Sequence, residues 1–105
     1  MIEGAERFKM LDTGGYKKEQ IQAGDKTVVC FMGEDGKVST IPDHNIFILD
    51  PEGNVVWDMS MVFKGPDAAV NMRVEDGKLY FNIFYGYRFC IDLETLETLE
   101  KLFTK

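Results

Sequence analysis

The sequence predicts an all-β domain, an antiparallel meander of about eight to ten short strands. Short runs rich in β-branched and aromatic residues alternate with turn signals along the chain. Two elements also recur. Asp35-Gly36-Lys37 returns 41 positions later as Asp76-Gly77-Lys78, and Phe47-Ile48-Leu49-Asp50 returns 42 positions later as Phe89-Cys90-Ile91-Asp92. A period of about 40–45 residues is typical of stacked β-sheet units.

Length and composition narrow the class of protein. The chain has 105 residues, which predicts a single domain, divided here into a half unit (1–22) and two full units (27–57 and 69–103). A net charge of −6 argues against a nucleic-acid partner, which requires clustered Lys and Arg. No apolar run approaches the roughly 20 residues of a membrane helix, and no signal peptide is recognised. Only two cysteines occur, and we expect them to be buried, reduced thiols in a cytoplasmic protein.

In the first unit, an apolar run from Thr27 to Met32 predicts a strand covered on both sides. Asp35-Gly36 predicts a hairpin turn, because such turns need positive φ angles. Three further strands are then expected at residues 37–41, 46–49 and 55–57. Trp57, on the last of them, is expected to lie in the core.

The second unit is expected to repeat this order, with strands at 69–74, 78–84, 88–91 and 95–103. The last segment fits either a helical stripe or a strand, and by analogy with the first unit we assign a strand. Residues 58–69 connect the units. The segment 8–22 is expected to form two strands joined through Thr13-Gly14-Gly15.

At Phe89-Cys90-Ile91-Asp92-Leu93-Glu94-Thr95, preceded by Asp76-Gly77-Lys78-Leu79-Tyr80, the chain resembles a blade of the quinoprotein-like or WD40-like β-propellers. The resemblance covers roughly residues 27–103, in two copies. Those blades commonly combine Asp-Gly-Lys, an apolar strand, and Leu-Asp followed by a Thr-Gly turn. The chain departs from that pattern at Leu96, where such blades usually carry glycine, and at Pro51-Glu52-Gly53 in place of the threonine turn. No cofactor-binding residue of the family can be carried over, so no cofactor is expected.

Propellers usually close with four or more blades, whereas this chain encodes about two and a half. Other subunits must then complete a ring, or the sheets must form a small β-sandwich or open barrel. Both faces of the first predicted strand are apolar, with Val28 and Cys30 on one and Val29 and Phe31 on the other. Since an uncovered apolar face is an association site, we expect a homo-oligomer. A remnant of a longer propeller is a further interpretation.

An antiparallel meander sends successive turns to alternating ends of its sheets. This predicts an acidic end, made by the first and third turns of each unit. Its candidate partner-binding residues are Glu34, Asp35, Asp50, Glu52, Glu75 and Asp76, with Asp92 and Glu94 at the same end. Turn chemistry alone also accounts for these acids. The functional hypothesis is a protein-interaction module that captures a basic protein, resembling the small acidic immunity proteins that neutralise basic toxins.

The opposite end carries aromatic and mixed polar residues. Asp43, His44, Tyr85, Tyr87 and Arg88 are candidates for a carbohydrate or small-ligand site, since sugars stack on aromatic rings. The alternative is that the two tyrosines simply pack on the sheet.

Catalysis and metal binding have little support. His44 is the only histidine, and Ser39 and Ser60 lack the glycines of a nucleophile elbow. No phosphate-binding glycine loop is present. The sequence therefore predicts a non-enzymatic recognition protein without a metal.

Overall fold

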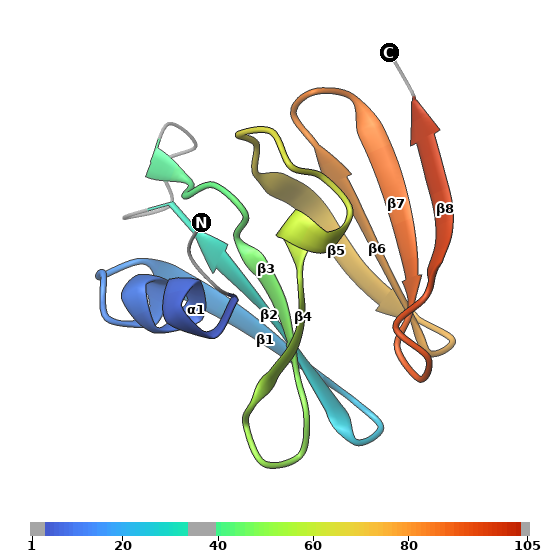
Figure 1. Cartoon of the computed structure of the whole chain (residues 1–105), viewed down its shortest axis with the longest axis horizontal. Helices are drawn as coiled ribbons and strands as arrows, with labels where there is room; N and C mark the ends of the chain where they lie inside the picture. Colours follow the sequence, from blue (N-terminus) through green and yellow to red (C-terminus); the bar gives the residue numbers. More distant parts are fainter. Residues whose placement is uncertain (1–3, 34–39, 104–105) are drawn as a thin grey trace.

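The computed structural model describes residues 4–33 and 40–103, which form two four-stranded antiparallel sheets and one short α-helix (Figure 1). Sheet 1 contains β1 (Lys17–Ala23), β2 (Lys26–Met32), β3 (Ile46–Leu49) and β4 (Val55–Asp58), in that order. Sheet 2 contains β5 (Ala69–Glu75), β6 (Lys78–Ile83), β7 (Tyr87–Asp92) and β8 (Thr98–Phe103), also in order. The prediction of an all-β meander is confirmed at this level.

The amino-terminal segment differs from its prediction. Gly4–Asp12 forms helix α1, where the sequence predicted a strand from Phe8. The helix ends where the Thr13 amide donates to the Lys9 carbonyl, and Gly15 then turns the chain at a φ of 82°. No helix in the described part of the chain is long and apolar enough to cross a membrane.

The limits of the first unit also differ. The expected strand at 37–41 is wrong for its described residues, because Thr40 and Ile41 lie in no strand, and its other residues are outside the described ranges. The fourth strand of sheet 1 is instead β1, which pairs with β2 from Lys17–Met32 to Ala23–Lys26. β1 confirms the second of the two strands expected in the segment 8–22, although its sequence, Lys-Lys-Glu-Gln-Ile-Gln-Ala, is almost entirely polar.

The second unit matches its prediction closely. The four strands of sheet 2 occupy the expected ranges within a few residues. The closing segment 95–103, which fitted either a helix or a strand, contains strand β8. Leu96 has a φ of 64° and its amide donates to the Asp92 carbonyl, so a turn interrupts the helical stripe that this segment also suggested.

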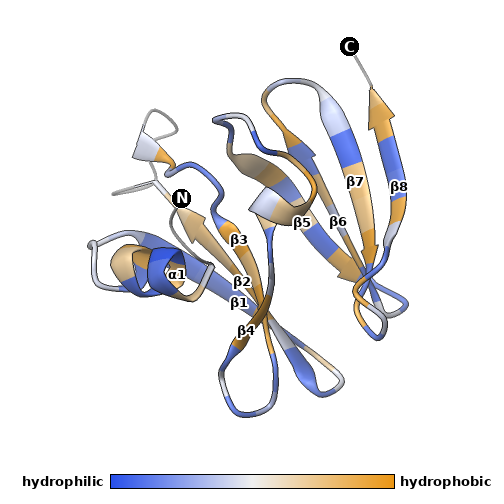
Figure 2. Cartoon of the chain, in the orientation of Figure 1, coloured by the Kyte–Doolittle hydropathy of each residue, from blue (hydrophilic) through white to orange (hydrophobic). Residues whose placement is uncertain are grey.

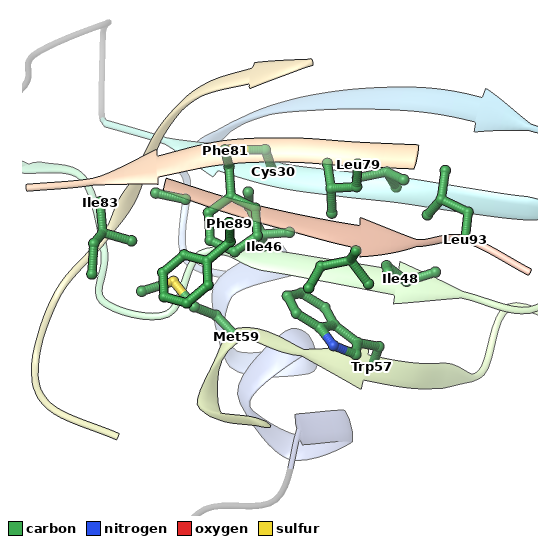
Figure 3. Close-up of a cluster of buried hydrophobic side chains, with 13 residues drawn as sticks. Cys30, Ile46, Ile48, Trp57, Met59, Leu79, Phe81, Ile83, Phe89 and Leu93 are labelled. Carbon is green, nitrogen blue, oxygen red and sulfur yellow. The ribbon is translucent and has the colours of Figure 1, made fainter. Parts of the chain in front are cut away.

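The main core lies between the two sheets, on the faces that we call inner (Figure 3). Sheet 1 contributes Ile46, Ile48 and Trp57, and the Trp57 ring meets Phe81 of sheet 2 edge-on at 6.0 Å. Met59, in the 3-10 turn η3 (Met59–Met61), closes this core from one side. Trp57 is 2% exposed, which confirms its predicted core position. Both cysteines are free and buried, as expected.

Helix α1 covers the outer face of sheet 1. Phe31 and Phe47 point to this face, and the Phe8 ring packs edge-on against both, with centroid distances of 5.5 and 5.3 Å. Lys18 on β1 pairs with Asp12 at the end of the helix at 2.7 Å. The uncovered apolar sheet face that motivated the homo-oligomer prediction is therefore covered within the chain, and oligomerisation stays a prediction.

The two sheets are also joined by hydrogen bonds at one end. The Asn45 side chain accepts from the Ala69 amide at 2.6 Å and donates to the carbonyls of Ala69 and Phe31 at 3.1 and 2.8 Å. Asn45 is 1% exposed. Beside it, the His44 amide donates to the Asp67 carbonyl, and the Asp67 carboxylate accepts from three backbone amides. We call this network the inter-sheet clamp.

β8 is an edge strand whose residues are all exposed. Lys101 on β8 points toward the inner side of sheet 2, with its ammonium 5.3 Å from the Tyr87 ring centroid and 5.8 Å from that of Phe89. The same ammonium donates to the Val62 carbonyl at 3.5 Å. An amphipathic side chain therefore closes the core at this edge.

Replacing Phe8 with alanine is expected to reduce the free energy of unfolding by about 2 kcal/mol, because the ring fills the space between α1 and sheet 1. The matched control is Met10→Ala on the same helix, since Met10 is 57% exposed and should change stability by less than about 0.5 kcal/mol. Denaturant unfolding measures both. Equal effects of the two substitutions would contradict the packing of α1 on sheet 1.

Replacing Asn45 with alanine is expected to cost about 2–3 kcal/mol, because the Ala69 amide would lose its partner inside the protein. Asn54→Ala is the control, since the Asn54 side chain makes one exposed hydrogen bond of 3.4 Å to Asp50. Urea unfolding of both variants tests the clamp, which would be contradicted by a loss at Asn45 no larger than that at Asn54.

Candidate functional site

Four turns lie at the same end of the two sheets, in the lower part of Figure 1. They join β1 to β2, β3 to β4, β5 to β6, and β7 to β8. Figure 2 shows these turns as largely hydrophilic. We call this region the acidic end; its described carboxylates are Asp25, Asp50, Glu52, Glu75, Asp76, Asp92, Glu94 and Glu97.

Two of these carboxylates build their own turns. Asp50 Oδ1 accepts from the amides of Glu52 and Asn54 at 3.0 and 2.8 Å. Asp92 Oδ1 accepts from the amides of Glu94 and Thr95 at 2.8 and 3.1 Å. Turn chemistry thus accounts for these two acids, and it leaves their negative charge at the surface.

These hydrogen bonds also keep Asp92 ionised. The amides of Thr95 and Glu94 lower the pKa of the Asp92 carboxyl below its usual value of 3.8, with a smaller contribution from the charge of Lys78. Asp92 therefore carries its charge at any pH above the acid range.

A cleft of about 530 Å³ opens between three of the turns. Its lining comes from both sheets: Asp25 and Lys26 from the β1–β2 turn, Asp76 and Lys78 from β5–β6, and Asp92 and Glu94 from β7–β8. Four carboxylates face two ammonium groups there, so the cleft is negative overall. The Gly77 carbonyl accepts from the Leu93 amide at 3.0 Å, which holds two of the turns together.

The predicted acidic residues are only partly brought together. Asp76 lines the cleft, while Asp50 and Glu52 lie in the neighbouring β3–β4 turn at the same end. Glu75, at the end of β5, pairs with Arg73 at 3.1 Å.

Two of the predictions fall on Glu34 and Asp35, which lie outside the described residues. β2 runs toward the opposite end, since Met32 pairs with Lys17 at the start of β1. The turn that was predicted to follow this strand at the acidic end is replaced there by Gly24-Asp25, between β1 and β2. Asp25 was missed; its neighbour Gly24, with a φ of 63°, was the available signal for a hairpin.

The candidate ligand residues of the opposite end are divided between two surfaces. Tyr85 and Tyr87 stack at 6.0 Å on the inner side, near Phe63, and Arg88 points to the outer face of sheet 2, where it pairs with Glu100 at 3.4 Å. Neighbouring residues of a strand alternate between faces, so Arg88 cannot join the tyrosines.

The remaining two candidates also differ from each other. His44 is 7% exposed, and its Nε2 lies 2.9 Å from the Phe63 carbonyl oxygen. The ring is therefore buried beside the inter-sheet clamp. Asp43 is exposed.

Metal and nucleophile chemistry find little support in the arrangement of the side chains. Within residues 4–33 and 40–103, no three His, Cys, Asp or Glu side chains are grouped as metal ligands. Burial and the nearby charge of Glu19 raise the pKa of the Cys30 thiol to about 12, so it is not a thiolate at neutral pH.

Comparisons with protein-family models, with curated proteins and with solved structures found no significant match to this chain. The assignment of function therefore depends on the geometry alone.

Stability at low pH should depend on Asp92. Because its pKa is lowered in the folded state, its stabilising effect is present above pH 3.8 and is lost as the pH falls through the folded-state pKa. In Asp92→Asn, which keeps an acceptor for the turn, this loss should be absent as the pH falls below 3.8. Thermal unfolding across this range measures the difference, and identical pH profiles for both proteins would contradict the assignment.

Proposed function

We propose that this protein is a non-enzymatic recognition module that binds a basic protein partner through its acidic end. The observation that supports this proposal is the cleft of about 530 Å³, to which both sheets contribute carboxylates. Because the turns come from separate sheets held by one core, the charges are fixed relative to one another before a partner arrives. Fixed complementary charge accelerates association and selects against partners of the wrong sign.

The chemistry of the cleft favours a Lys- or Arg-bearing segment as the occupant. Asp76 is exposed, and Glu94 is exposed on the adjacent turn of the same sheet. Lys78 also lines the cleft and reduces its net negative charge. A cleft with this lower charge suits a flexible cationic side chain better than a small divalent ion. A neutralising partner of a basic toxin is one protein that would use such a surface.

The architecture that carries this end is proposed to be a pair of blade-like units. Counted from the first turn of each sheet, the pair Val28–Ile48 of sheet 1 corresponds to Tyr80–Cys90 of sheet 2. The Asp50 and Asp92 turns correspond in the same way. The offset between matching residues is 52 positions in β2 and β6 but 42 in β3 and β7, so sheet 1 has a longer connection between its second and third strands.

The test is a titration of the ¹⁵N-labelled protein with a hexalysine peptide at low and moderate salt. Shifts are expected at Asp25, Asp76 and Glu94, and binding should weaken as salt screens the charges. The double variant Asp76→Asn/Glu94→Gln should bind about 3- to 10-fold more weakly, the range expected for two exposed charge pairs. Asn is chosen because Asp76 has a φ of 52°, which Asn tolerates.

The matched control is Glu6→Gln/Asp43→Asn, which removes the same charge from exposed positions outside the acidic end. It should leave the affinity within about twofold of the parent protein, because screened charges beyond the binding surface contribute little. An equal loss of affinity in both double variants would mean that only net charge matters and would reject the proposed surface.

A further inference from the structure

The outer face of sheet 2 carries a second, separate concavity. This groove has a volume of about 290 Å³ and lies over β5, β6, β7 and β8. Every side chain that lines it is polar: Asn71, Arg73, Tyr80, Asn82, Arg88 and Glu100. We call it the polar groove. No residue of the acidic cleft contributes to it.

Comparison of the two sheets shows that this face is built for polar contact. On the inner face of sheet 1, the positions on β2 and β3 are Val28, Cys30, Ile46 and Ile48, and sheet 2 covers them. The matching positions on β6 and β7 are Tyr80, Asn82, Arg88 and Cys90. Tyr80, Asn82 and Arg88 thus stand at the positions that Val28, Cys30 and Ile46 occupy in sheet 1. Because these three side chains carry hydrogen-bonding groups, a further apolar sheet does not fit this face.

A β-bulge in β5 places the Arg73 side chain in the wall of the groove. Val70 pairs with Asn82 and Arg73 pairs with Tyr80, so both face outward although an uninterrupted strand would place them on opposite faces. The register shift between them spans Asn71 and Met72, and Asn71 is a non-glycine residue with a φ of 55°. Bulges commonly re-aim side chains beside binding sites. Without this one, Arg73 would point into the core.

The groove presents hydrogen-bond donors and acceptors around a flat surface, which the Arg73 guanidinium and the Tyr80 ring form. The Arg73 guanidinium lies 4.5 Å from the centroid of the Tyr80 ring, and more than half of its side chain remains exposed. A hydrogen bond with Cys90 raises the pKa of the Tyr80 hydroxyl, so that group stays neutral. A stacked guanidinium presents a planar surface on which an apolar ring face can rest.

The charged groups argue against a simple anion. Arg88 pairs with Glu100 at 3.4 Å, and Arg73 pairs with Glu75 at 3.1 Å, so each guanidinium has a carboxylate beside it that would repel an anionic ligand. Exposed pairs of this kind contribute little stability and can exchange partners readily. Hydroxyl groups that donate and accept at once match such mixed pairs, as well as the amides of Asn71 and Asn82.

We propose that the polar groove binds one pyranose ring of a neutral saccharide. The ring's hydroxyls would bond to Arg88, Glu100 and Asn82, and its C–H face would rest on the Arg73–Tyr80 stack. The volume supports a single ring, since it lies at the low end of the range for small-ligand sites. This site shares only Arg88 with the ligand residues predicted from the sequence, and it is independent of the proposed partner surface.

The experiment is a chemical-shift titration of the labelled protein with methyl glycosides of glucose, galactose, mannose and N-acetylglucosamine. At least one of them is expected to shift the signals of Asn82, Arg88 and Glu100 with millimolar affinity. Glu100→Gln, on the exposed edge strand, should weaken that binding about 5- to 10-fold without altering the fold. Asn82→Ala provides a second variant with the same expected loss.

Asp76→Asn/Glu94→Gln is the matched control and should bind the glycoside as the parent protein does, which separates this site from the acidic end. No shift with any glycoside would overturn the proposal. Shifts confined to Tyr85 and Tyr87 would also overturn it, since they would place the ligand on the other side of the sheet. Equally strong binding of sulfate at Arg88 would replace the saccharide by a simple anion.

Discussion

The Asn45 side chain sets how the two sheets lie against each other. Apolar contacts between the sheets are non-directional, so they leave more freedom in the relative position of the sheets than hydrogen bonds do. The Asn45 amide removes this freedom, because it bonds to both the N–H and the C=O of Ala69 on β5 while holding the Phe31 carbonyl on β2. It thereby replaces a peptide group of a neighbouring strand. The acidic end combines turns from both sheets, so its geometry depends on a contact at the opposite end of the molecule.

Much of the fold follows from local sequence, and its exceptions have local reasons. The run from Val28 to Phe31 identifies β2 because it is apolar on both faces, as a covered strand must be. β1 has a single large apolar residue, Ile21, because an edge strand beside a helix needs few apolar contacts. The spacing of Phe8 and Leu11 suits one face of a helix, a pattern that the prediction of a strand from Phe8 did not take into account.

The candidate site could be predicted in outline only. Alternation of turns along a meander was enough to gather Asp50, Asp76 and Asp92 at one end. The contribution of Asp25 was missed although a strand was expected before it, because Gly24-Asp25 was not recognised as the turn between that strand and β2. The polar groove was beyond sequence reasoning, since Arg73 reaches the outer face through a bulge that no pattern of alternation indicates.

Lys101 has a consequence for the free edge of β8. Any chain that extended sheet 2 by hydrogen-bonding to this strand would enclose an ammonium group that now rests over Tyr87 and Phe89 with its charge near solvent. Inward-pointing charges of this kind are a common protection against edge-to-edge aggregation. The exposed Leu99 and Phe103 would otherwise make β8 attractive to amyloid-like growth. The inward-pointing lysine thus disfavours the pairing of another strand with β8.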